Sequence, residues 1–170
     1  MKRLLMLPLV LVACSESAPE SHVDSGPKDA TPSWILTSTP GEAIMVGALK
    51  PTAKEGDEVI VRGMIGGRKD AIDEATGTFI IVDPSLMSCS EVSDDDHCPT
   101  PWDYCCEPQE DVTAQSATIQ LVDASGVPIA IDPASTGIDH DADVVVVGVV
   151  APRPSDAVLV IRATGIRKIN

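Results

Sequence analysis

The sequence predicts an all-β domain, a small five-stranded barrel that carries a long cysteine-rich loop. Five segments rich in β-branched residues are bounded by Gly, Pro or Asp, at about residues 58–66, 76–83, 114–123, 143–151 and 157–169. No segment has the period of a long helix, and glycines within the segments allow the strong coiling of a small barrel. Hydrophobic residues make up 44% of the chain but aromatic residues only 2%, so Val, Ile and Ala must fill the core.

The N-terminus resembles that of a bacterial lipoprotein. A positively charged start precedes an apolar run, residues 4–13, which is too short to span a bilayer as a mature helix. The run ends in Leu11-Val12-Ala13-Cys14, which matches the lipobox pattern of an aliphatic residue, two small residues and Cys. The resemblance implies that residues 1–13 are a signal peptide. It also implies that Cys14 becomes a lipidated N-terminus, carrying acyl chains such as palmitate that anchor the protein in a membrane. An ordinary secretory signal is the alternative.

Both interpretations place the domain outside the cytoplasm, in the bacterial cell envelope, where disulfides persist. Ser15, in place of Asp, suggests the outer membrane, with the domain facing the periplasm. Removal of residues 1–13 takes away two of the 12 Lys and Arg residues and leaves 10 against 26 Asp and Glu, a net charge of −16. Such a surface repels phosphate backbones, so we expect no nucleic-acid partner, and it favours cations or basic partners.

A disordered tether is predicted for residues 14–40, because Ser, Pro and Thr dominate and little apolar surface is available to bury. The short apolar cluster at residues 34–36 is expected to dock onto the domain. The barrel domain then occupies residues 41–170. Its lead-in, residues 41–53, is interpreted either as a short helix that ends at Pro51 or as an extended segment.

Turn signals separate the remaining strands. A polar, Gly-containing connection at 66–70 follows the first strand, and Asp83-Pro84 ends the second. Residues 123–126 form a hairpin-type turn before a returning segment at 127–131. Residues 132–142 are a loop, and Pro152 to Asp156 turns the chain into the last strand.

Four of these segments are similar to strands of OB-fold proteins, especially the small periplasmic bacterial OB-fold family. They read Glu-Gly-Asp-Glu-Val-Ile-Val-Arg-Gly-Met-Ile-Gly at 55–66, Gly-Thr-Phe-Ile-Ile-Val-Asp at 77–83, Asp-Val-Val-Val-Val-Gly-Val-Val at 143–150 and Leu-Val-Ile-Arg-Ala at 159–163. The resemblance implies an OB-like barrel over residues 55–169, with a β-sandwich as the competing architecture.

The chain departs from the OB pattern in two places. The cysteine-rich loop between strands two and three is an insertion. The helix expected between strands three and four is reduced to a short remnant near residues 133–139. We therefore expect the cysteine-rich loop to cover one end of the barrel, with Trp102 and Tyr104 packed across it.

The cysteine-rich loop, at about residues 84–113, holds four of the five cysteines: Cys89, Cys98, Cys105 and Cys106. Prolines in its central stretch lack backbone donors, and the hydrophobic pattern there fits neither helix nor strand. In an oxidising compartment, two disulfides are the simplest prediction. Adjacent cysteines rarely bond each other. This leaves Cys89–Cys105 with Cys98–Cys106, or Cys89–Cys106 with Cys98–Cys105.

The same loop offers an alternative metal site. The four cysteines and His97 are soft ligands that suit copper(I) or zinc, although no Cys-x-x-Cys pair is present. Thiol redox exchange through a strained disulfide is a further variant. The acidic run at 94–96 lacks the spacing of an EF-hand and is interpreted as solvated. His140, between two aspartates, is interpreted as exposed.

No motif in the sequence favours an enzyme, since Gly-x-Ser-x-Gly, His-Glu-x-x-His and phosphate-loop patterns are absent. The predicted function is a non-enzymatic envelope lipoprotein whose domain binds a protein, peptide or small ligand without a required cofactor. Trp102, Tyr104 and His97 are the candidate binding residues. An equally open interpretation is that Trp102 and Tyr104 are both buried beneath the loop as its small core. The alternative function is handling of zinc or copper, or thiol redox chemistry. A nucleic-acid-binding OB module is disfavoured by charge and by the scarcity of aromatic residues.

Overall fold

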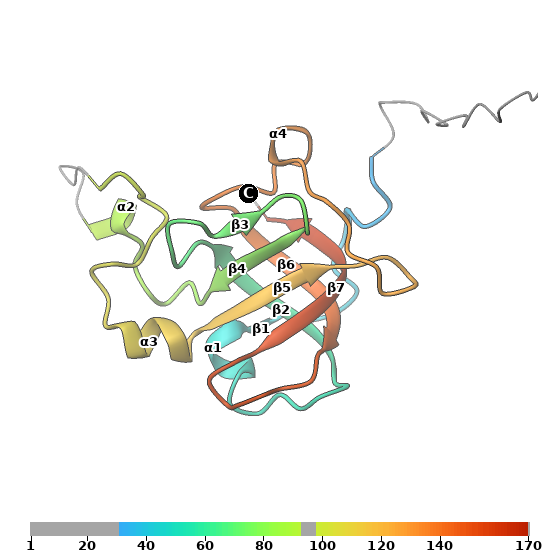
Figure 1. The fold of residues 1–170 in the computed structure, drawn as a ribbon, viewed down its shortest axis with the longest axis horizontal. Coiled ribbons are helices and arrows are strands. Elements are labelled where there is room, and N and C mark those ends of the chain that lie inside the picture. The colour runs from blue at the N-terminus through green and yellow to red at the C-terminus, as the bar shows by residue number, and fades with distance from the viewer. Residues whose placement is uncertain (1–30, 93–97, 170) are drawn as a thin grey trace, which may run out of the picture. The chain divides into compact units, whose positions relative to one another are not determined.

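A closed β-barrel forms the centre of the computed structural model, which describes residues 31–92 and 98–169 (Figure 1). Five strands follow one another around the barrel in the order β2–β6–β7–β5–β4, and β4 pairs again with β2. The strands are β2 (Glu58–Ile65), β4 (Thr78–Val82), β5 (Ser116–Leu121), β6 (Asp143–Val150) and β7 (Val160–Lys168). The five predicted strands are thus confirmed, each within a few residues of its predicted bounds.

The pairing pattern is that of an OB-like barrel, as predicted. Neighbouring barrel strands are antiparallel except β5 and β7, which run parallel, as a Greek-key connection requires. The sheet closes through a short seam of two residue pairs, Met64 with Val82 and Ile65 with Ile81. Closure removes the free edges that a flat sheet of this composition would expose.

The core is aliphatic because alternate residues of each strand point inward. In β2, the buried positions alternate with more exposed ones from Val59 to Ile65. Phe79 is the only aromatic residue on a barrel strand, and it is 1% exposed. The predicted dominance of Val, Ile and Ala in the core is confirmed.

The lead-in contains both of the elements that the sequence left open. Strand β1 (Ile44–Met45) pairs parallel with β2, and helix α1 (Val46–Leu49) follows it directly. The Gly47 amide donates to the Asp83 carboxylate over 2.8 Å, so a side chain 36 residues away stabilises the start of α1. Additional short elements are β3 (Ile72–Asp73), α2 (Cys89–Val92), α3 (Gln109–Ala114) and α4 (Pro133–Thr136).

Two sequence predictions are corrected here. The stretch around the cysteines is not wholly irregular, because α2 begins at Cys89. The segment at 127–131 is not a full strand, because it makes only a bridge between Val122 and Pro128 and isolated hydrogen bonds. Within the described ranges, no helix has the length and apolar content that a membrane span requires.

The barrel is filled from its own connections and not by the cysteine-rich loop. Val46 and Leu49 of α1, and Ile131 and Ile138 of the β5–β6 connection, belong to the main core. Tyr104 instead joins a separate small cluster with Val82 and Val112, so it is not part of the main core. The expectation that the loop covers one end of the barrel stays a prediction.

The predicted docking of residues 34–36 is confirmed. Trp34 is 7% exposed. The Leu36 amide donates to the carbonyl of Ile166 on β7, and the Ile166 amide donates to the Trp34 carbonyl. This part of the predicted tether therefore packs as part of the barrel. The signal peptide, Cys14 and residues 15–30 of the tether lie outside the described residues.

Two turn glycines give a matched test of the β4–β5 side of the barrel. Both have positive φ, 60° at Gly77 and 81° at Gly126, but a Cβ at Gly77 would lie 1.8 Å from the Ile129 carbonyl oxygen. A Cβ at Gly126 would meet nothing within 4 Å. We expect Gly126→Ala to lower the free energy of unfolding by about 1 kcal/mol, and Gly77→Ala by about 3 kcal/mol or more. Urea denaturation measures both, and equal losses would contradict the described turn.

Candidate functional site

The cysteine-rich loop is fixed to the barrel next to the closing seam. The Gly67 amide, just beyond β2, donates to the Trp102 carbonyl over 3.1 Å, and the Trp102 indole N–H donates to the Lys69 carbonyl over 3.0 Å. A Cβ on Gly66 would lie 2.3 Å from the Trp102 carbonyl oxygen, so only glycine permits this close approach. The loop therefore continues the contacts of β2 where the sheet itself ends.

Two arms of the loop pair with each other and bring the cysteines together. The Cys89 amide donates to the Asp103 carbonyl over 2.8 Å, and the Ser90 amide donates to the Pro101 carbonyl over 3.0 Å. The sulfur atoms of Cys89, Cys105 and Cys106 all lie within 4.8 Å of one another. Cys89 is fully buried, whereas Cys105 and Cys106 are exposed.

The thiols of this cluster differ in acidity. Burial is the main cause that raises the pKa of Cys89. The hydrogen bond with Cys89, followed by burial, raises the pKa of Cys105 to about 12. Hydrogen bonding with the backbone and then the hydroxyl of Thr100 lowers the pKa of Cys98, and the thiols of Cys89 and Cys105 act in the same direction. Cys98 is therefore the thiol that ionises more readily than either of them.

No pair among the described cysteines lies at disulfide-bonding distance. The sulfur atoms of Cys89 and Cys105 are 2.9 Å apart, compared with about 2.05 Å in a disulfide. The predicted pair of disulfides thus stays a prediction. The other predicted ligands, His97 and the acidic run at 94–96, lie outside the described residues.

The aromatic residues of the loop are packed against the protein. Tyr104 is 4% exposed and contacts Val82 and Val112, and its burial raises the pKa of its hydroxyl. Trp102 stacks on His140 with ring centroids 4.1 Å apart, and His140 in turn contacts Asp139. Of the two predictions for these aromatics, the structure favours burial for Tyr104, and Trp102 serves as an anchor between loop and barrel. His140 is half-buried rather than fully exposed.

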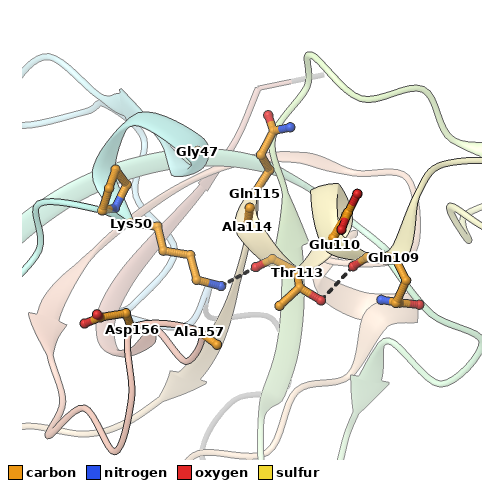
Figure 2. A pocket seen from close by; sticks show the side chains of 10 residues that line it. Gly47, Lys50, Gln109, Glu110, Thr113, Ala114, Gln115, Asp156 and Ala157 are labelled. Atoms are coloured by element: carbon orange, nitrogen blue, oxygen red, sulfur yellow. Dashed lines mark hydrogen bonds between the residues drawn. The ribbon is translucent and has the colours of Figure 1, made fainter.

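A second candidate site is an open cavity of about 580 Å³ between α1, α3 and the β6–β7 connection (Figure 2). Most of its exposed lining surface is apolar, although six of the ten lining residues are polar or charged. The lining residues are Gly47, Lys50, Pro51, Gln109, Glu110, Thr113, Ala114, Gln115, Asp156 and Ala157.

Lys50 is the central polar group of this cavity. Its ammonium reaches the end of α3 and donates to the Thr113 carbonyl over 2.5 Å (Figure 2). It also donates to the Ser116 carbonyl at the start of β5 over 2.8 Å. Lys50 is 5% exposed, and burial, with the nearby Arg153 charge, lowers its pKa. Arg153 donates to the Lys50 and Ala53 carbonyls and so fixes the β6–β7 connection against α1. Arg153 thus links two walls of the cavity.

The cavity continues along the barrel. A smaller space of about 110 Å³ shares Lys50 and Ala157 with it and extends over Ile80 of β4 and the first residues of β5. β4 and β5 are the second and third barrel strands, and the β6–β7 connection joins the fourth and fifth. OB-folds commonly bind their ligands on that face and at that connection.

Sequence reasoning missed this cavity, because Lys50 meets α3 and β5 through contacts 63 and 66 residues apart in the chain. Neither α1 nor α3 is long enough to give a periodic signal. Comparisons with models of protein families, with curated proteins and with solved structures find no match to this chain.

The acidity of the thiols gives a test of the cluster. A lowered pKa means more thiolate at a given pH, whereas a pKa near 12 leaves Cys105 protonated near neutrality. In reduced, chelator-treated protein at pH 7, we expect iodoacetamide to alkylate Cys98 at least about tenfold faster than Cys105. The thiolate of Cys105 is the stronger nucleophile because its thiol is the weaker acid, but this only partly offsets the larger thiolate fraction of Cys98. Buried Cys89 should react last. Peptide mass mapping over time measures the three rates.

Thr100→Val is the matched control, because it removes one hydrogen-bonding partner of Cys98 and leaves every thiol in place. We expect it to slow the alkylation of Cys98 and not that of Cys105. Equal rates at Cys98 and Cys105 in the unaltered protein would contradict the described hydrogen bonding.

Proposed function

We propose that this protein is a lipoprotein of the bacterial cell envelope, anchored through Cys14, that binds a small ligand or short peptide in the cavity beside Lys50. The cavity carries the proposal, since its volume of about 580 Å³ falls within the range of about 300–1,000 Å³ typical of ligand pockets. The lipobox and the signal-like N-terminus support the anchor and the envelope location. The binding role requires no catalytic group.

The chemistry of the cavity suggests what the ligand contains. An ammonium has three N–H groups, and the Thr113 and Ser116 carbonyls take two from Lys50. We infer that the third donates to an acceptor on the ligand, which favours a carboxylate, sulfonate or similar anionic group. The apolar wall favours a hydrocarbon or aromatic body. The carboxylates of Glu110 and Asp156, which line the cavity, favour a positively charged group on the ligand.

This site replaces the aromatic residues of the loop as the candidate binding surface. Tyr104 is buried and Trp102 is engaged with Lys69 and His140, so neither offers a free hot-spot ring. A metal-handling function is the second candidate, and the convergence of three thiols favours it. Thiol redox chemistry and nucleic-acid binding have weaker support, since the chain lacks Cys-x-x-Cys and is strongly acidic.

A fluorescent probe tests the cavity directly. The probe 8-anilinonaphthalene-1-sulfonate combines apolar rings with an anionic group, and we expect saturable one-site binding to the folded, detergent-solubilised full chain. Ala114→Trp should abolish binding by filling the cavity. Lys50→Met should weaken it by roughly tenfold, because it removes a charged hydrogen bond worth about 1.5 kcal/mol. Fluorescence titration measures the three affinities.

Val127→Trp is the control, because Val127 is 56% exposed on a turn outside the cavity. It adds the same side chain as Ala114→Trp and should leave probe binding unchanged. Cooperative urea unfolding of each variant separates loss of binding from loss of fold. Equal binding by Ala114→Trp and the unaltered protein, or no one-site binding at all, would contradict the proposal.

A further inference from the structure

The cysteine cluster has the arrangement of a metal site. Three sulfur atoms converge on one point, with every pair closer than 4.8 Å. Thiolates around a cation at about 2.3 Å lie about 3.8 Å from one another in a tetrahedral site, and slightly farther apart in a trigonal one. Both geometries fit inside the observed limit. The sulfur atoms of Cys89 and Cys105, 2.9 Å apart, would need to separate by about 0.9 Å.

The surrounding structure holds these donors in place. Cys89 begins α2 and is fully buried, and its amide is tied to Asp103 in the opposite arm of the loop. Cys105 and Cys106 follow Tyr104, which is itself buried against Val82 and Val112. Metal ligands on a fixed backbone need little ordering when the ion binds.

Charge around the cluster also suits a cation. Glu91 and Glu107 accept hydrogen bonds from the amides of Ser88 and Met87, which places two carboxylates in the same loop. The net charge of the chain is −14. A negative surface raises the local concentration of cations and supports the loss of protons when thiols bind metal.

The arrangement is less suited to two separate disulfides. A disulfide framework divides four sulfur atoms into two bonded pairs, whereas here Cys106 lies as part of one group with Cys89 and Cys105. We propose that Cys89, Cys105 and Cys106 form a thiolate site for a d¹⁰ cation, Zn²⁺ or Cu⁺. Cys98 lies in the same loop but outside the group of sulfur atoms that lie within 4.8 Å of one another. This site is independent of the cavity at Lys50.

The test begins with reduced, metal-free full chain in detergent, titrated separately with Co²⁺ as a spectroscopic substitute for Zn²⁺, with Zn²⁺, and with Cu⁺ against a chelating competitor. We expect one equivalent of cation and absorption from thiolate-to-metal charge transfer. Because Cu⁺ binds thiolates more tightly than Zn²⁺ at most cysteine clusters, the metal content of the isolated protein, and not the relative affinity, identifies the site as a zinc or a copper centre. Stoichiometric binding of neither cation would overturn the proposal.

Single replacements assign the ligands. Cys89→Ser, Cys105→Ser and Cys106→Ser should each weaken binding by on the order of 100-fold or more, which corresponds to at least about 2.7 kcal/mol. Ser90→Ala, beside the cluster, is the control and should bind as the unaltered protein does. Circular dichroism checks that each variant is folded. Unchanged affinity in a folded Cys105→Ser or Cys106→Ser variant would also overturn the proposal.

A second measurement does not depend on any variant. The protein is isolated from its own membrane without reductant, and its intact mass and metal content are measured before and after alkylation. We expect a stoichiometric zinc or copper ion and free thiols once the metal is removed. A mass four hydrogens lighter, with no metal, would show two disulfides and overturn the proposal.

Discussion

The two-pair seam between β2 and β4 is the constraint on which the rest of the structure depends. With only Met64–Val82 and Ile65–Ile81 pairing there, the sheet closes over a short distance. Beyond the seam, the Gly66 amide still bonds the Ile80 carbonyl, and the Gly67 amide bonds Trp102 of the cysteine-rich loop. The loop therefore takes over the pairing of β2 where β4 can no longer supply it. The short seam between β2 and β4 thus both closes the barrel and leaves the end of β2 free to hold the loop.

Both candidate sites depend on this docking. Asp83, at the start of the insertion, stabilises the first turn of α1 and pairs through its backbone with Gln115 at the end of the insertion. α1 carries Lys50, and α3 carries the opposite wall of the cavity. The same insertion brings Cys89 to Cys105 and Cys106. The insertion thus supplies one wall of the cavity, through α3, and all three cysteines of the thiol cluster.

Sequence patterns predicted the barrel strands because each is long enough to show β-branched residues bounded by turn residues. They predicted the gathering of cysteines only as a set of alternatives, since spacing along a loop does not determine which sulfur atoms meet. The cavity was not predictable, because Lys50 becomes important only through carbonyls on α3 and β5. Tyr104 lies outside the main core, to which Ile131, Ile138 and residues of α1 belong. Local patterns report local structure, whereas these sites are made by contacts distant in sequence.

If the cysteine-rich loop and the barrel form one cooperative unit, native-state hydrogen exchange will show that they open together. The informative amides are those of Gly67 and Cys89, which donate to the Trp102 and Asp103 carbonyls. The Thr118 amide, which donates to the Leu159 carbonyl, is the barrel reference. We expect all three to exchange with the same free energy of opening, equal to that of global unfolding. If Gly67 and Cys89 open several kcal/mol more easily than Thr118, the loop is instead an independent segment.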